Sequence, residues 1–174
     1  MRLMFAAAAV LCLAACQAEQ PGGPPADASA VVEAEAPSIP TPPPGEAQIP
    51  EEIVRALYAA PTIPTDAASI RKYFTEEFVP GLTPPDGEVG LVDFDYRING
   101  QDGSAQGLAL EEIAGGPTGG VVAARFINGT PQEIVWTVCR QPDGRLRIVE
   151  ASKAGPEGWS LRGLLRLPAR AEGC

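Results

Sequence analysis

The second half of the chain contains four apolar segments, each roughly ten residues long, separated by short turns rich in Gly, Pro and Asn. The segments cover residues 104–114, 120–128, 132–140 and 145–153. Val, Ile, Leu and aromatic residues are frequent in them, which favours β-strands, and connections this short join antiparallel neighbours. We therefore predict a four-stranded antiparallel meander.

Two short helices are expected before this sheet. The first begins with the sequence PEE at 50–52, where proline and acids suit a first helical turn, and it ends at Pro61. The second has Thr65 or Asp66 as its N-cap and carries Ile70, Tyr73 and Phe74, with or without a continuation over Phe78 and Val79 before a Pro-Gly pair. The predicted fold class is α+β, with short N-terminal helices packed on one face of a curved sheet.

The other face of this sheet is also apolar. Residues 134–139 read IVWTVC, and successive side chains of a strand point to opposite faces. Because two short helices cover only one face, we expect the second face to be a lined concavity or a contact surface.

The composition excludes several kinds of function. The 174 residues include no histidine, which removes His-based triads and His metal ligands. The formal net charge is −9, whereas nucleic-acid binding needs a basic face. We therefore expect no nucleic-acid partner. The sequence contains no cofactor-binding motif, and it does not decide whether the protein is an enzyme, although a non-catalytic role is favoured.

The N-terminus has the pattern of a secretory signal. Arg2 precedes an apolar run over 3–13, which is too short for a spanning helix of about 20 residues. Residues 13–16 read LAAC and resemble the lipobox of bacterial lipoproteins. That resemblance implies cleavage after a signal peptide of residues 1–15 and lipidation of Cys16. Gln17 resembles an outer-membrane sorting signal of Gram-negative bacteria. The alternative is an ordinary signal peptide with an incidental cysteine.

Residues 16–50 are expected to form a disordered, acidic tether that carries the lipid at its start. From residue 17 this stretch contains nine prolines, five acids and no Lys, Arg or aromatic residue, so it cannot bury enough apolar surface to fold. An alternative is a proline-rich ligand for a partner domain. The globular domain is then predicted over 51–174, facing the periplasm from the outer membrane.

Helices followed by a long meander give the element order of cone-shaped folds, and the chain resembles nuclear-transport-factor-2-like and cystatin-like proteins in this respect. Residues 53–167 also contain several short motifs in a characteristic order: VRALY at 54–58, YFT at 73–75, GEVG at 87–90, DFD at 93–95, NGQD at 99–102 and GWSLR at 158–162. In these motifs the chain resembles the YbjP-like group of proteobacterial envelope lipoproteins, a domain family of unknown function. The resemblance implies a fold and an envelope location, and no reaction or ligand.

The segment LVDFDYRINGQDG at 91–103 carries the candidate chemistry. In an extended strand Asp93 and Asp95 point the same way, about 6.6 Å apart. One hypothesis makes either of them a general base in a cone pocket, with a pKa raised by its neighbour or by burial. The favoured alternative is structural, in which polar loop residues bond their own backbone and the aromatic residues attach the loop to the core.

A metal site is a further hypothesis for the same segment. Its oxygen ligands would be Asp93, Asp95, Asn99 and Asp102, and Ca²⁺ accepts six to eight oxygens. The EF-hand register fails, however, because residues 97 and 98 are Arg and Ile. We therefore assign no metal ligand and keep the four residues as candidates only.

Two cysteines remain if Cys16 is lipidated and the signal is removed. Cys139 lies in a predicted strand and Cys174 is the last residue given. An oxidising compartment favours a disulfide between them. The alternative is a buried Cys139 and a free Cys174.

A basic, apolar segment ends the chain. Its leucines and Trp159 are expected to pack across the sheet, while Arg162, Arg166 and Arg170 reach water. An alternative is contact with an anionic lipid or a partner protein. Arg125, within a predicted strand, is expected to pair with a carboxylate.

The leading functional hypothesis is a lipid-anchored envelope protein that acts as a non-catalytic binding or interaction module. Its partner would be an unknown envelope protein or a small ligand. The alternatives are a small-molecule-binding or hydrolytic enzyme that uses Asp93 or Asp95, and an immunity-type protein that caps a partner.

Overall fold

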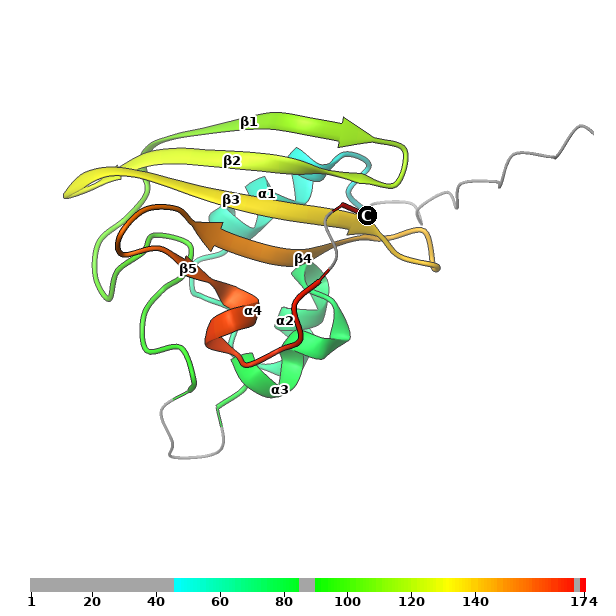
Figure 1. Ribbon diagram of the computed structural model, residues 1–174, viewed down its shortest axis with the longest axis horizontal. Coiled ribbons are helices and arrows are strands. Elements are labelled where there is room, and N and C mark those ends of the chain that lie inside the picture. Colours follow the sequence, from blue (N-terminus) through cyan, green and yellow to red (C-terminus); the bar gives the residue numbers. More distant parts are fainter. Residues whose placement is uncertain (1–45, 85–89, 171–172) are drawn as a thin grey trace, which may run out of the picture. The chain divides into compact units, whose positions relative to one another are not determined.

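The centre of the protein is a five-stranded antiparallel sheet in which the strands pair in chain order (Figure 1). The computed structural model describes residues 46–84, 90–170 and 173–174. The predicted signal peptide, Cys16, the tether up to residue 45 and residues 87–89 of the GEVG motif lie outside these ranges. The strands are β1 (Gln106–Gly116), β2 (Gly119–Asn128), β3 (Thr130–Arg140), β4 (Leu146–Lys153) and β5 (Trp159–Ser160).

The four predicted strands are confirmed, with their ends shifted by two residues or fewer. The predicted strand count was nevertheless one too low, because β5 pairs with the end of β4 through Ser152↔Ser160 and Lys153↔Trp159. A two-residue strand is too short to produce a recognisable period in the sequence.

The first helix, α1 (Pro50–Ala59), begins and ends as predicted. Pro50 occupies the first turn, and Glu51 and Glu52 follow it. Ile53, Val54 and Leu57 are buried on one side of the helix. Figure 1 shows α1 behind β2 and β3, so its apolar side covers one face of the sheet.

The second predicted helix is divided in the structure. In α2 (Ala67–Tyr73) the Asp66 side chain accepts hydrogen bonds from the backbone N–H groups of residues 68 and 69, which confirms the Asp66 alternative. Phe74 then adopts an extended conformation and forms a parallel bridge with Ile148 of β4. The alternative with a continuation to Val79 was therefore wrong. Phe78 and Val79 belong to the separate turns η1 (Glu76–Phe78) and α3 (Val79–Leu82).

The hydrophobic core lies between the helices and one face of the sheet. Ile134, Trp136 and Val138 of β3 are fully buried in it. Because alternate residues of a strand share a face, their neighbours at 133, 135 and 137 point to the opposite face. Tyr96 and Phe74 are also fully buried, and the Tyr96 ring lies edge-on to both Phe74 and Trp136.

The opposite face of the sheet carries a row of charges across three strands. Arg125 of β2 forms ion pairs with Glu111 of β1 and Glu133 of β3, which confirms the expected pairing of this arginine. About half of each side chain is exposed, so these pairs contribute little to stability.

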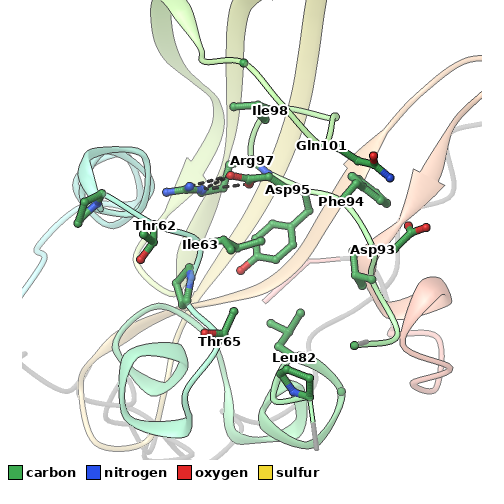
Figure 2. Close-up of a pocket in the computed structure, with 18 residues that line it drawn as sticks. Thr62, Ile63, Thr65, Leu82, Asp93, Phe94, Asp95, Arg97, Ile98 and Gln101 are labelled. Carbon is green, nitrogen blue, oxygen red and sulfur yellow. Dashed lines mark hydrogen bonds and ion pairs between the residues drawn. The ribbon is translucent and has the colours of Figure 1, made fainter. Parts of the chain in front are cut away.

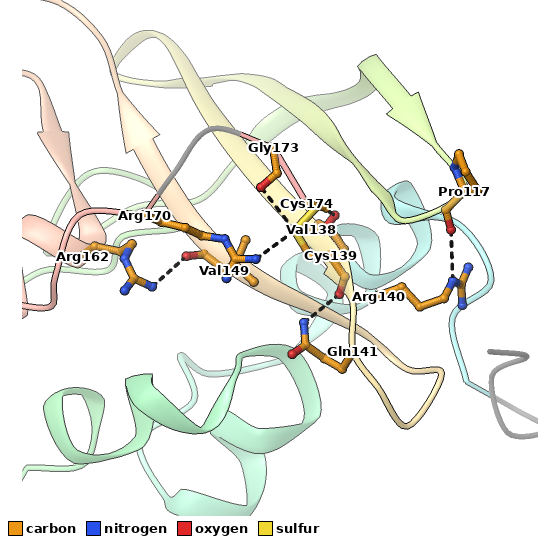
Figure 3. The surroundings of a disulfide bond; sticks show 10 residues. All are labelled: Pro117, Val138, Cys139, Arg140, Gln141, Val149, Arg162, Arg170, Gly173 and Cys174. Carbon is orange, nitrogen blue, oxygen red and sulfur yellow. Dashed lines mark hydrogen bonds between the residues drawn. A yellow bond between two sulfur atoms is a disulfide. The ribbon is translucent and has the colours of Figure 1, made fainter. Parts of the chain in front are cut away.

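The C-terminal residue is attached to the sheet by the predicted disulfide, which is confirmed. Cys174 is bonded to Cys139 of β3, and Arg170 Nη2 lies 3.8 Å from the Cys139 Sγ (Figure 3). Gly119 at the start of β2 lies against this bond, because a Cβ placed there would be 2.8 Å from the Cys174 Sγ.

Arg162 corrects one expectation for the basic segment. It lies in α4 (Leu161–Leu164) and was predicted to reach water, but it is buried and its guanidinium pairs with Glu77. No local sequence pattern indicates this contact, because Glu77 is 85 residues away. In the part of the chain that the structure describes, no helix is long and apolar enough to cross a membrane.

Candidate functional site

The acidic segment borders a cavity beside the C-terminal end of α1 (Figure 2). The cavity has a volume of about 670 Å³, which is in the usual range for small-molecule sites. Three stretches of chain form its walls: the loop between α1 and α2 at 61–65, the end of α3 with Pro84, and much of the segment 90–103. Asp93 and Asp95 both line it, as the pocket hypothesis required.

Asp95 is bound to Arg97 across one edge of the cavity. The Arg97 Nη2 donates to Asp95 Oδ2 at 2.7 Å, and Nε donates to both carboxylate oxygens at 3.0 and 3.1 Å. The backbone N–H of Arg97 also donates to Asp95 Oδ1 at 2.9 Å. Both side chains are largely buried, with 17% of Asp95 and 10% of Arg97 exposed. Every oxygen of the Asp95 carboxylate therefore accepts hydrogen bonds from Arg97.

Arg97 also closes the C-terminal end of α1. Its Nη1 donates to the carbonyl oxygens of Leu57 at 3.2 Å and of Ala60 at 2.9 Å. Tyr58 returns a hydrogen bond, from its hydroxyl to the Arg97 carbonyl oxygen, at 2.7 Å. A cation at this end of a helix donates hydrogen bonds to the last carbonyl oxygens and interacts favourably with the helix dipole. The ion pair thus joins the acidic segment to the helix.

Asp93 has a different environment from Asp95. It is exposed, and no basic side chain of the described residues forms an ion pair with it. Figure 2 shows its carboxylate pointing away from that of Asp95. The expected alignment on one strand face was wrong, because the chain is not a regular strand here and bends at Phe94, between the two aspartates. Asp95 pairs with Gly100 in an isolated antiparallel bridge, and Asn99 has a φ of 52°.

The four candidate metal ligands do not share one position. The Asp95 carboxylate is paired with Arg97. Asn99 accepts a hydrogen bond from Trp159 Nε1 at 2.7 Å and donates one to Gln132 at 3.2 Å. Asp102 is exposed and does not line the cavity. Within 46–84, 90–170 and 173–174, no three His, Cys, Asp or Glu residues gather as a metal site would need. Asn99 serves instead to fix the acidic segment to β3 and β5.

Tyr96 supplies a polar atom that has no partner. The side chain is fully buried and lines the cavity, and its hydroxyl has no hydrogen-bond partner among the described residues. Burial raises the pKa of Tyr96, and also that of Tyr58, well above the ordinary value. Both phenols are therefore protonated at neutral pH.

Sequence reasoning missed Arg97 and the loop at 61–65 as parts of this site. One signal was present: Arg97 stands between the apolar side chains of Tyr96 and Ile98, two positions after Asp95. A buried arginine needs a carboxylate partner, and Asp95 is the nearest one in the sequence. The loop at 61–65 carried no comparable signal.

Comparisons with protein-family models, curated proteins and solved structures found no match to this chain.

Proposed function

We propose that the chain is a lipid-anchored protein of the bacterial cell envelope whose globular domain is a non-catalytic binding module. The sequence LAAC at 13–16, with Cys16 as the lipidated residue, supports the anchor. The cavity beside α1 supports a binding role. Gln17 supports sorting to the outer membrane, with the domain in the periplasm.

The hydrogen bonding of the Asp95 carboxylate is the observation that supports a non-catalytic role. A general base needs a free lone pair directed at the substrate proton. Both oxygens of Asp95 are engaged by the side chain and backbone of Arg97. Asp93 is exposed beside the cavity, and no ion pair with another described residue holds its carboxylate. The described lining residues thus offer recognition without a positioned acid, base or nucleophile.

The element order and the short motifs support a proposed fold and a proposed family. The element order, with helices on one face of a meander and a cavity at the end of α1, suits a nuclear-transport-factor-2-like or cystatin-like cone. The short motifs favour the YbjP-like group of envelope lipoproteins. Of these motifs, residues 93–95 and 99–102 lie in the segment that borders the cavity.

The anchor is tested by mass spectrometry of the mature N-terminus. We expect a chain that begins at Cys16 with a diacylglyceryl group on sulfur, and accumulation of the uncleaved precursor in cells treated with globomycin. A Cys16→Ser variant should leave the membrane fraction. An unmodified Cys16 in a cleaved chain would refute the lipid anchor.

The binding role is tested with the unlipidated Cys16→Ser chain and a small-molecule extract of bacterial envelopes. Native mass spectrometry should reveal a compound that is retained in a one-to-one complex and released unchanged. An enzyme would instead consume a compound and accumulate product in excess over protein. Retention of a protein toxin with loss of its activity would favour the immunity-type alternative.

A further inference from the structure

We propose that the disulfide between Cys139 and Cys174 undergoes thiol–disulfide exchange, in which a small thiol becomes bonded to the sulfur of Cys174. This inference rests neither on the cavity beside α1 nor on the proposed binding function. Three features carry it: the unequal exposure of the two cysteines, a hollow beside Cys174, and an arginine beside the Cys139 sulfur.

The two cysteines differ in their access to solvent. Cys139 lies within β3, and 1% of this residue is exposed. Cys174 is exposed. Exchange begins with the direct approach of a thiolate to one of the two sulfur atoms. The attack is therefore directed at Cys174, and Cys139 becomes the sulfur that leaves.

A hollow of about 220 Å³ lies beside Cys174. The β1–β2 hairpin forms most of its wall with four glycines among its residues, and Thr137 of β3 and Gly173 complete the wall. Because glycine has no side chain, the space next to the sulfur stays open: a Cβ at Gly119 would lie 2.8 Å from the Cys174 Sγ. The described lining residues carry no charged side chain. Small-molecule sites usually measure about 300–1,000 Å³, so this smaller hollow suits a compact thiol.

Arg170 stabilises the sulfur that leaves. A thiolate in a buried position is unfavourable unless a cation lies close to it. The Arg170 Nη2 lies 3.8 Å from the Cys139 Sγ, and Figure 3 shows the guanidinium directed at the disulfide. Among the described residues, no carboxylate forms an ion pair with Arg170. Arg147 lies opposite Cys139 on β4, but its Nη1 is 3.8 Å from Glu46 Oε2, so its charge is partly neutralised.

The exchange step balances without a further reagent. The incoming thiol first loses its proton to solvent, and its sulfur forms a bond to the Cys174 Sγ. The bond between the two cysteine sulfurs breaks, and its electron pair leaves on the Cys139 Sγ, beside Arg170. One disulfide replaces another, so no oxidant or reductant other than the thiol is consumed. The reverse step, in which the Cys139 thiolate attacks the mixed disulfide, releases the thiol and restores the original bond.

The test uses 2-mercaptoethanol as the probe, because it is a compact and uncharged thiol. The probe is added to the folded chain carrying Cys12→Ser and Cys16→Ser, in which Cys139 and Cys174 are the cysteines that remain. Early samples are treated with N-ethylmaleimide and mapped by mass spectrometry. We expect the mercaptoethanol adduct on Cys174 and the maleimide on Cys139, before the fully reduced chain accumulates.

Two arginine variants test the stabilisation of the leaving sulfur. Arg170→Gln should lower the rate constant for adduct formation by about two- to tenfold, since a less stabilised thiolate leaves more slowly. Arg166→Gln is the matched control, because Arg166 is exposed and forms no ion pair within the described ranges.

A second measurement separates the charge of Arg170 from its effect on stability. In chains that also carry Cys174→Ala, the alkylation of Cys139 by iodoacetamide is followed as a function of pH. The half-maximal rate should be reached at a higher pH in the Arg170→Gln variant, because the thiolate has lost its cation. A change in stability alone would not move this midpoint.

The proposal is overturned if the folded chain forms no adduct, or if the adduct lies on Cys139. Equal modification of both cysteines would also overturn it, because that result is expected from the unfolded chain. Equal rates for Arg170→Gln and Arg166→Gln, with an unchanged alkylation midpoint, would refute the role of Arg170.

Discussion

Arg162 and Glu77 are joined by two hydrogen bonds although 85 residues separate them in the chain. The Arg162 Nη1 donates to Glu77 Oε1 at 2.7 Å, and Nη2 donates to Oε2 at 3.0 Å. The Nε donates to the carbonyl oxygen of Pro168 at 2.9 Å. One buried guanidinium thus connects α4, the turn η1 and the C-terminal segment.

Replacing Arg162 by Met should lower the free energy of unfolding by about 1–3 kcal/mol, because hydrogen bonds to charged groups are lost and the Pro168 carbonyl loses its donor. Urea denaturation of the Cys16→Ser chain with and without the substitution measures this. Arg166→Met is the control, since Arg166 is exposed and forms no ion pair within the described ranges. Equal effects of the two variants would contradict the structural role of Arg162.

The same contact predicts a pH dependence. The hydrogen bond from Arg162 lowers the pKa of Glu77 below its ordinary value of 4.5. The folded state therefore binds fewer protons than the unfolded state, so the stabilisation is complete above about pH 4.5 and is lost as the pH falls through the lower folded pKa. In thermal unfolding, Glu77→Gln should be less stable than the parent at pH 7, and the difference should shrink towards pH 3. Glu157→Gln, at an exposed turn position, should show no such convergence.

Asp95→Asn should be among the most destabilising conservative substitutions in the domain. It leaves the Arg97 guanidinium buried without its carboxylate, which typically costs about 3–5 kcal/mol. Asp93→Asn, two positions away, should change the free energy of unfolding by less than about 0.5 kcal/mol, as is usual for surface positions. Chemical denaturation measures both. Similar effects at the two positions would mean that the ion pair with Arg97 contributes little.

A double-substitution cycle refines that result. If Asp95→Asn destabilises the protein by leaving the Arg97 guanidinium unpaired, the double variant with Arg97→Met should lose less free energy of unfolding than the sum of the two single variants. The double variant should still have a lower free energy of unfolding than the parent, because Arg97 also donates to the carbonyl oxygens of Leu57 and Ala60 at the end of α1.

Much of the fold is predictable because its information is local. The turns between strands carry Gly, Pro and Asn, and Gly129 and Gly144 have the positive φ that such turns need. The start of α1 and the N-cap at Asp66 depend on residues within one helical turn. The break after Tyr73 is different, because Phe74 is held extended by its bridge to Ile148, a contact that no local pattern contains.

The candidate site was predictable only in part. The acidic segment was identified from its composition, and it does border a cavity. The different roles of its two aspartates were not, because they depend on a bend at Phe94 between them and on the contacts of Arg97 with the end of α1. Arg97 acquires its role from the end of α1, about 40 residues earlier, so that role appears only when the chain is folded.

Removing the disulfide should lower the free energy of unfolding by about 3–4 kcal/mol in the chain-entropy model, since the bond closes a loop of 35 residues. The double variant Cys139→Ala and Cys174→Ala tests this by urea denaturation. The parent measured in a dithiol reductant should approach the same value. A variant as stable as the oxidised parent would show that the bond does not restrict the unfolded chain enough to matter.

Gly119→Ala should destabilise the protein through the backbone that surrounds this disulfide. Gly119 has a φ of +145°, and a Cβ there would lie 2.1 Å from the Val138 carbonyl oxygen and 2.8 Å from the Cys174 Sγ. Strain of this kind costs about 1–3 kcal/mol. Thermal unfolding and titration of free thiols in denaturant should reveal a lower midpoint and incomplete oxidation. Gly116→Ala, in the same hairpin with no atom within 4 Å of its Cβ, should match the parent in both measurements.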